Sequence, residues 1–285
     1  MSTIYDAIVI GAGPAGGATA YFLSEAGLRV LVLEKARLPR YKPCGGGVSA
    51  ALLAQFPFSF DPVIESRVTS ISYALGDRTV TIPLPDHLVR MVMRTEFDQH
   101  LLNHATVEVR QETAVCRVQE VADRVVVETK KGQTFSGRYL IGADGASSIV
   151  AKSVGLRRGK LLAAAIEAEA PVAEAVMRRF AAAPLFIFGE VRMGYLWVFP
   201  KADHLSVGIG ALKPRPGELQ ATLNRVMARH QPGRRDTARL SAAGVRPPRA
   251  SCNAPRFPGW GCRRSDRSAY RRGDSFCRAE RSTGG

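Results

Sequence analysis

The sequence contains no run of about 18 consecutive apolar residues, so no transmembrane helix is expected. It enters an apolar segment at Ile4, with none of the regions that make up a secretory signal peptide before it. We therefore expect a cytoplasmic protein.

Cysteine is scarce, with five in 285 residues. Only Cys44 and Cys116 precede residue 245, and neither belongs to a C-x-x-C or His-x-His pattern. Disulfide frameworks and zinc sites depend on closely spaced ligands of this kind. We therefore predict neither a disulfide framework nor a metal site.

Acidic residues are also few, 25 against 40 Lys and Arg, which gives a net charge of +15. Such a charge can indicate a nucleic-acid or membrane partner, but its distribution matters more than its size. From Val245 onward there are ten Arg and only three acidic residues. Because these last 41 residues carry +7 of the +15, far more than their share of the length, the charge is concentrated in the tail. Nucleic-acid binding is therefore the least favoured interpretation and we expect no such partner.

The first 35 residues have the pattern of a β-α-β unit. Ile4–Ile10 predicts a buried strand, the segment from Pro14 has helical spacing up to a terminal Gly27, and Leu28–Lys35 predicts a second buried strand. Such a unit implies two parallel strands joined by a right-handed crossover.

A G-x-G-x-x-G motif joins the first strand to the helix. The first glycine permits a tight turn, the second lets the backbone approach a pyrophosphate, and the third lets helix and strand pack closely. The helix start then offers N–H groups to the phosphates, and Glu34 stands where a carboxylate accepts from ribose hydroxyls. The residues that we expect to bind a dinucleotide here are Gly11, Gly13, Pro14, Ala15, Gly16, Glu34 and Lys35.

Two later segments resemble the flavoprotein family that includes glutathione-reductase-type and hydroxybenzoate-hydroxylase-type FAD enzymes. One is GRYLIGADGASS at Gly137–Ser148, and the other is VRMVMRTEFDQHLL, which contains Arg94. The resemblance implies FAD as cofactor, with Asp144 and Gly145 near its phosphate and ribityl region. It also implies that Arg94 opens a helix and faces the cofactor, although a solvated charge at a helix start is the alternative.

Two further motifs look like those of the geranylgeranyl reductase family, FAD enzymes that hydrogenate isolated double bonds in polyprenyl chains. One is RYKPCGGGVS at Arg40–Ser49, and the other is the Y-x-W-x-F-P…G-x-G spacing of GYLWVFPKADHLSVGIG. The first contributes Cys44, Gly45, Gly46 and Gly47 to the expected cofactor site. The second contributes Tyr195, Trp197, Phe199, Gly208 and Gly210 to the expected substrate site.

Alternation along a strand places Tyr195, Trp197 and Phe199 on one side, where they would form an aromatic wall for an apolar polyene. The two glycines Gly208 and Gly210 would let the neighbouring backbone approach a ligand. An aromatic core strand is the alternative. The resemblance places Cys44 near the flavin, as a contact or a proton donor, while a structural buried cysteine remains equally open.

The reductase resemblance implies that NADPH or a reduced electron carrier supplies electrons through FAD to a polyprenyl lipid substrate. Contact with a membrane surface is a further expectation, because such substrates are lipids. The alternative is an FAD-dependent aromatic monooxygenase or halogenase of the hydroxylase type, which shares the glycine motif, Arg94 and Asp144. No residue is assigned as general acid, and the oligomeric state is left open.

The predicted fold is α/β, with a Rossmann-like FAD-binding domain interleaved with a β-rich substrate domain. Residues 1–60 and 90–160, with a β-meander at 106–136, are assigned to the first domain. Residues 61–89 and 161–230 are assigned to the second, including an amphipathic helix near its end.

The family's third FAD signature, a strand ending in Gly-Asp, is expected near residues 255–275 and is absent. Read one frame away with permitted codons, Trp260 to Gly284 gives GDAAGLTDPLTGEGIHFAVRSGQRA, which contains that signature. We therefore expect residues 235–285 to be an out-of-frame or disordered tail that follows a frameshift around 235–256. Weak FAD retention and impaired activity would follow.

Overall fold

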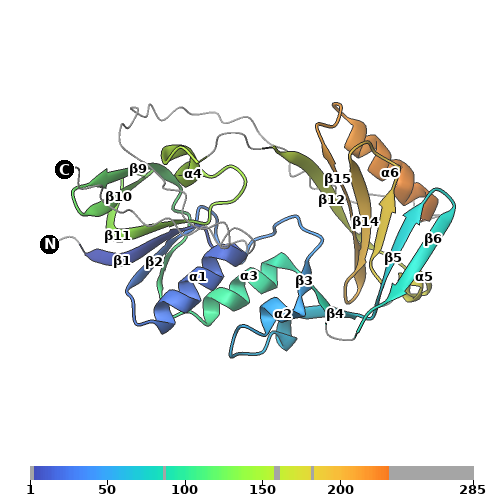
Figure 1. Ribbon diagram of the computed structural model, residues 1–285, viewed down its shortest axis with the longest axis horizontal. Helices are drawn as coiled ribbons and strands as arrows, with labels where there is room; N and C mark the ends of the chain where they lie inside the picture. The colour runs from blue at the N-terminus through green and yellow to red at the C-terminus, as the bar shows by residue number, and fades with distance from the viewer. Residues whose placement is uncertain (1–2, 86–87, 157–160, 181–182, 231–285) are drawn as a thin grey trace, which may run out of the picture. The chain divides into compact units, whose positions relative to one another are not determined.

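The computed structural model describes residues 3–85, 88–156, 161–180 and 183–230, and it divides the chain into two compact units. The described part of the first unit is 3–40 and 98–156, and that of the second is 41–85, 88–97, 161–180 and 183–230. The chain therefore passes from the first unit to the second and back before it enters the second again, and Figure 1 shows its elements in order.

The first unit contains one six-stranded sheet in the order β8-β2-β1-β11-β10-β9. Strands β8, β2, β1 and β11 run parallel, while β11, β10 and β9 form an antiparallel meander. The strands are β1 (Ile4–Ile10), β2 (Val30–Leu33), β8 (Glu108–Arg110), β9 (Val115–Val121), β10 (Arg124–Thr129) and β11 (Thr134–Gly142). Helix α1 (Pro14–Glu25) joins β1 to β2, and α4 (Ile149–Ser153) follows β11.

The central strands of this sheet are apolar throughout because both of their faces are covered. Ile8 and Leu31 belong to a cluster on one face, while Val9 and Val32 belong to a cluster on the other. All four side chains are fully buried. A continuous apolar run, with no alternation, is what such a position requires.

The second unit contains a six-stranded sheet in the order β12-β15-β14-β13-β5-β6 and a small sheet in the order β3-β7-β4. The larger sheet consists of β5 (Ser70–Leu75), β6 (Arg78–Pro83), β12 (Ala163–Pro171), β13 (Leu185–Phe188), β14 (Gly194–Pro200) and β15 (His204–Leu212). The smaller consists of β3 (Gly47–Ser49), β4 (Ile64–Val68) and β7 (Val89–Val92). The helices are α2 (Ala50–Leu53), α5 (Glu174–Phe180), α6 (Glu218–His230) and α3 (Arg94–Asn103), which begins in this unit and ends in the first.

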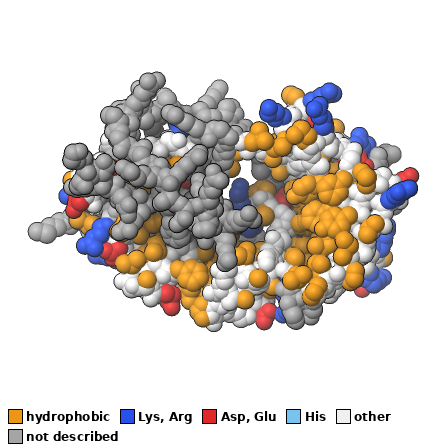
Figure 2. Space-filling model, viewed as in Figure 1, with side chains coloured by type: hydrophobic (Ala, Val, Ile, Leu, Met, Phe, Trp, Pro, Cys, Tyr) orange, Lys and Arg blue, Asp and Glu red, His pale blue; other side chains and the backbone are white. Residues whose placement is uncertain are grey.

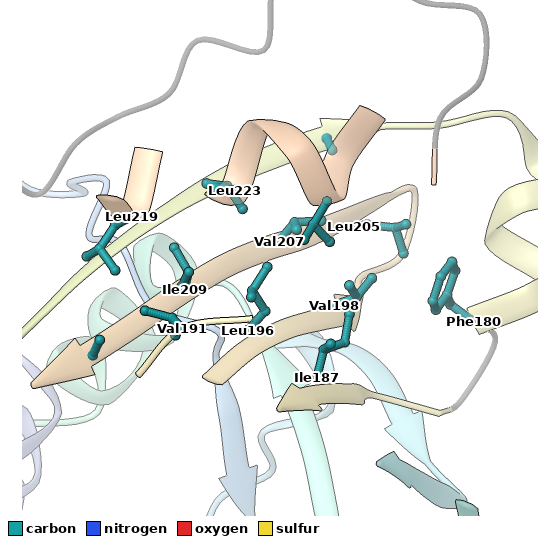
Figure 3. Close-up of a cluster of buried hydrophobic side chains, with 13 residues drawn as sticks. Phe180, Ile187, Val191, Leu196, Val198, Leu205, Val207, Ile209, Leu219 and Leu223 are labelled. Atoms are coloured by element: carbon teal, nitrogen blue, oxygen red, sulfur yellow. The ribbon is translucent and has the colours of Figure 1, made fainter. Parts of the chain in front are cut away.

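Helix α6 covers one face of the larger sheet. Leu219 and Leu223 point from the helix toward Ile209 and Val207 of β15, and Phe180 at the end of α5 extends the same cluster (Figure 3). Leu223 is fully buried. The apolar side of α6 therefore packs on β15 and forms the main core of the second unit.

Several sequence predictions are confirmed. The β-α-β unit is present, and the second strand is shorter than predicted, Val30–Leu33 against Leu28–Lys35. The predicted amphipathic helix is α6. The mixed α/β fold with two interleaved units agrees with the predicted class.

The boundaries between the units differ from the predicted ones. Residues 41–60 and 90–97 were assigned to the FAD-binding domain, but the structure groups them with the second unit. The reason is β7, which pairs with β3 on one side and β4 on the other and so holds both segments in one small sheet. The predicted tail with its frameshift, residues 235–285, lies outside the described residues. In the part of the chain that is described, no helix is long and apolar enough to cross a membrane.

Candidate dinucleotide site and aromatic face

In the first unit, the predicted dinucleotide loop lies at the carboxyl ends of β2, β1 and β11. Gly11 follows β1 with a φ of 100°, and its N–H donates to the carbonyl of Leu33 at 2.8 Å. A Cβ at Gly11 would lie 2.5 Å from the carbonyl oxygen of Ala143, and one at Gly16 would overlap the carbonyl of Gly11. The close approach of three backbone segments therefore requires glycine at both positions.

Glu34 ties this loop to the end of β2. Its Oε2 accepts from the N–H of Ala12 at 2.8 Å, and its Oε1 accepts from the N–H of Ala36 at 3.0 Å. Arg40 lies 3.8 Å from Oε1 and donates to Asp98 at 3.0 Å. The carboxylate of Glu34 therefore already has a structural function, and its predicted hydrogen bond to a ribose stays a prediction.

The start of α1 offers N–H groups as hydrogen-bond donors, and the loop after β11 offers a carboxylate as an acceptor. Gly13 caps α1 without a side-chain hydrogen bond, and Pro14 follows it. Asp144 accepts from the N–H of Ile149 at 2.6 Å through Oδ2, while its Oδ1 is buried with no partner among the described residues. A helix start favours phosphate oxygens, and a carboxylate oxygen requires a donor such as a hydroxyl.

These features fit FAD, which carries both phosphates and ribityl and ribose hydroxyls. The helix start after Gly13 would hold phosphate oxygens, and Asp144 would accept from a hydroxyl. Gly145 has a φ of 78°, so the turn after Asp144 favours glycine, and Lys35 is exposed next to Glu34. Arg94 begins α3 as predicted, and its contact with a cofactor stays a prediction.

In the second unit, β14 presents an aromatic row on the face opposite the core. Tyr195, Trp197 and Phe199 alternate with the buried residues Leu196 and Val198, and neighbouring rings in the row are 6.3 Å apart. The exposed fraction falls from 41% at Tyr195 to 9% at Phe199. The predicted common orientation of the three rings is confirmed.

Three rings that sequence reasoning missed extend this row. Phe186 contacts Tyr195 and Phe199 at centroid distances of 5.6 and 5.1 Å, and Phe188 lies 5.9 Å from Tyr195. Tyr73 of β5 stacks on Phe186 at 5.6 Å. We call Tyr73, Phe186, Phe188, Tyr195, Trp197 and Phe199 the aromatic face. Figure 2 shows hydrophobic side chains gathered over the sheet of this unit.

The two glycines predicted to admit a ligand differ in their surroundings. A Cβ at Gly208 would overlap the indole ring of Trp197, whereas the nearest atom to a Cβ at Gly210 is the Cβ of Ala165 at 3.5 Å. Gly208 is therefore required by the protein's own tryptophan, a reason different from the predicted one. A methyl group at Gly210 would make only ordinary van der Waals contacts.

The loop of Cys44–Gly47 packs against the same row of rings. A Cβ at Gly45 would lie 2.7 Å from the ring of Phe199 and 3.1 Å from Nε1 of Trp197. Gly46 has a φ of 70°, and its carbonyl accepts from the N–H of Val92 at 2.9 Å. Cys44 is a half-buried free thiol. Two of the predicted motifs, far apart in the sequence, are thus brought together.

Two buried charged residues at this loop were missed by the sequence analysis. Lys201 donates to the carbonyls of Gly45 and Val92 at 2.9 and 2.8 Å, and burial lowers its pKa. Glu167 accepts from the Tyr41 hydroxyl at 3.0 Å, and burial raises the pKa of its carboxyl. The only sequence signal was a charge next to or inside an otherwise apolar strand.

His204, the first residue of β15, forms an ion pair with Glu169 of β12. Its Nε2 lies 3.0 Å from Glu169, and its Nδ1 lies 2.6 Å from Asp203. The bond with Glu169 raises the pKa of His204, burial opposes this, and Asp203 adds to the increase. Protonated His204 is therefore favoured in the folded protein.

Comparison with known protein families agrees with this geometry. Residues 6–60 match a family described as FAD dependent oxidoreductase, and residues 72–188 match one described as FAD binding domain. Together these matches include the glycine loop, Arg94 and Asp144.

Among curated proteins, the chain is 34% identical to an uncharacterized protein of Methanosarcina barkeri over 207 residues, which is 72% of this chain and 53% of that protein. It is 32% identical to geranylgeranyl diphosphate reductase of Rhodobacter capsulatus over 225 residues, 74% of this chain and 55% of the relative. The chain thus spans about half the length of the curated relatives it matches.

Solved structures share the fold. A geranylgeranyl bacteriochlorophyll reductase-like protein of Thermoplasma acidophilum matches with a TM-score of 0.69 at 22% identity, over 81% of this chain and 63% of that one. The halogenase PltM in complex with phloroglucinol and FAD matches with a TM-score of 0.65 at 21% identity, over 80% and 56%. Fold and site thus define an FAD-dependent oxidoreductase.

Within that class, the chain is similar in sequence to geranylgeranyl diphosphate reductases. The resemblance indicated by the Cys-Gly-Gly-Gly loop and the Y-x-W-x-F-P strand is confirmed.

Replacing Gly208 by Ala should displace the Trp197 ring, because the new methyl group needs the space that the indole occupies. We expect a loss of roughly 1–3 kcal/mol in the free energy of unfolding, typical of overpacking. Urea titration would measure it, and Trp197 fluorescence in a Trp260→Phe background would report the ring. Gly210→Ala is the matched control, and an equal loss in both variants would contradict this account.

The His204 pair should make stability depend on pH. The pKa of His204 is raised on folding, so its contribution is fully present below the unfolded value of about 6.5 and is lost as pH rises through the folded value. We expect roughly 1 kcal/mol or less from this partly exposed pair. Urea titrations from pH 5 to 9, a range of about four units around that value, should show this component in the wild type and not in His204→Gln or Glu169→Gln. Identical pH profiles in all three would refute it.

Proposed function

We propose that this chain carries the cofactor-binding and hydrocarbon-binding parts of an FAD-dependent reductase that hydrogenates C=C bonds of a geranylgeranyl or other polyprenyl chain. The observation that carries the proposal is the aromatic face, six rings on one side of a sheet, beside the Cys44–Gly47 loop. Sequence similarity to a geranylgeranyl diphosphate reductase supports it.

An aromatic face suits a polyprenyl chain for physical reasons. The chain offers methyl groups and isolated double bonds and forms no hydrogen bonds along its length, so apolar burial must supply its binding energy at about 25 cal/mol per Å². Rigid rings provide such area with little loss of side-chain entropy.

FAD, when bound, supplies the two-electron reduction of the double bond, and the electrons come from NADPH or a reduced electron carrier. The chain's own residues would bind, orient and exclude water. The start of α1 and Asp144 would hold the cofactor, and the aromatic face would keep the polyene in register. The Cys44 thiol is the candidate to supply the proton that completes the hydrogenation.

The location proposed for such a protein is the cytoplasm, with contact to a membrane surface through which a lipid substrate reaches it. Exposed apolar residues of the second unit, among them Leu75, Val80 and Ile82, support a surface of this kind.

The direct test is the reduction of geranylgeranyl diphosphate by purified protein with FAD and dithionite or NADPH, followed by mass spectrometry. We expect products that have gained one molecule of hydrogen for each double bond reduced. Oxygen consumption on an aromatic substrate without alkene reduction would instead favour a monooxygenase or halogenase, the class of which PltM is a structural neighbour. Neither activity, in protein shown to bind FAD, would reject both proposals.

The aromatic face gives this assay a specific prediction. Tyr195→Ala removes a ring that is partly exposed and so available to a substrate. We expect KM for geranylgeranyl diphosphate to rise about tenfold, the effect of losing one partly buried apolar contact of about 1.4 kcal/mol, with little change in kcat. Tyr139→Ala, an exposed tyrosine of the first unit, is the control and should leave KM unchanged.

A further inference from the structure

Three consecutive residues of the Cys44–Gly47 loop each have a partner from a different strand or strand end. The backbone N–H of Cys44 faces the Glu167 carboxyl group and stabilises its charged form. The carbonyl of Gly45 accepts from Lys201 at 2.9 Å, and that of Gly46 accepts from the N–H of Val92 at 2.9 Å. A loop rich in glycine is thus held by one backbone hydrogen bond at each of Cys44, Gly45 and Gly46.

The two side chains that hold the loop also hold its surroundings. Glu167 accepts from the hydroxyl of Tyr41, three residues before Cys44, so one carboxyl group contacts both the approach to the loop and its first residue. Lys201 also donates to the carbonyl of Val92 at 2.8 Å. Lys201 therefore bonds both to the loop and to Val92 of β7, whose own N–H donates to the loop.

The sheet register places these groups beside the aromatic face. Glu167 of β12 is opposite Gly208 of β15, which is opposite Trp197 of β14. Residues paired across neighbouring strands project on the same side of a sheet. Glu167 therefore projects on the face that carries Trp197, whose ring fills the space over Gly208.

Burial makes this arrangement energetically demanding. Glu167 is 1% exposed and Lys201 is 2% exposed. A buried charge is tolerated when opposite charges and hydrogen bonds compensate it. Lys201 is supported by the carboxyl groups of Glu169, Glu65 and Glu167, while Glu167 is opposed by Glu169 and supported by Lys201. His204 in turn pairs with Glu169.

We propose that Glu167 and Lys201 are positioning residues that clamp the backbone of Cys44–Gly46 against Trp197 and Phe199 and thereby set the accessibility and reactivity of the Cys44 thiol. The catalytic consequence rests on the proposed reductase function, but the clamp itself does not. A purely structural pair would support the fold without controlling the thiol.

The test is the rate at which iodoacetamide alkylates Cys44, measured from about pH 6.5 to about pH 10.5, roughly two units to either side of the ordinary pKa of a free thiol. Peptide mapping of the full chain resolves Cys44 from the other cysteines, and Cys116 in the first unit is an internal reference. The variants are Lys201→Met and Glu167→Leu, which keep the approximate size of the side chain and remove its hydrogen bonds. Glu167→Gln retains an acceptor at the same place.

We expect the limiting rate at high pH to rise about tenfold in Lys201→Met and Glu167→Leu, because losing a hydrogen bond to a charged group releases the loop. Glu167→Gln should stay within about twofold of the wild type, since the amide oxygen still accepts a hydrogen bond. Glu174→Gln, which alters an exposed acid of α5 in the same unit, is the control and should leave Cys44 unchanged.

Unchanged Cys44 rates in both Lys201→Met and Glu167→Leu, with circular dichroism as in the wild type, would overturn the proposal. An equal increase in Glu174→Gln would also overturn it, because the effect would then be general. If the variants do not fold, hydrogen exchange of the wild-type peptide that contains Cys44–Gly46 decides: slow exchange supports the clamp and rapid exchange rejects it. None of these measurements requires FAD or substrate, so they stand even if no alkene is reduced.

Discussion

The alternation of side chains along β14 is the constraint on which the second unit depends. Leu196 and Val198 project to one side and complete the core beneath α6, while Tyr195, Trp197 and Phe199 project to the other. Because one strand serves both faces, its position is fixed by apolar packing that has no part in binding. The rings on its other side are therefore held on a rigid support, and the precision of a site on such a support exceeds that of a site built on loops alone.

The same strand explains why sequence reasoning succeeded in part. Alternation has a period of two and is local, so the common orientation of three rings could be predicted from seven residues. The contributions of Tyr73, Phe186 and Phe188 could not, because they depend on β13 lying between β14 and β5. Strand order joins segments more than a hundred residues apart, and no local pattern encodes it.

The buried charged residues show a second limit to what can be predicted from the sequence. Lys201 follows an apolar strand and Glu167 lies within an alanine-rich one, positions that by themselves indicate solvent-facing residues. Their burial results from the Cys44–Gly47 loop, which brings backbone carbonyls and an N–H group to them across the sequence. The first unit is easier to predict, since the glycine motif, its strand and its helix are contiguous. Even there, the contacts of Glu34 with Ala12 and Ala36 gave the acid a structural function that spacing did not reveal.

Glycine links the two halves of the second unit's candidate site. Gly208 leaves the space that Trp197 fills, and Gly45 then approaches the same indole and the ring of Phe199. A side chain at either position would displace the tryptophan or lift the loop, so the ring, the strand and the loop are mutually dependent. Charged groups border this assembly because the loop's peptide groups need partners once glycine has brought them into an apolar environment. The combination of an apolar platform with a polar edge is therefore a consequence of packing a glycine loop on an aromatic sheet. In the proposed reductase, this combination would place a surface for hydrocarbon next to groups that can hold a proton.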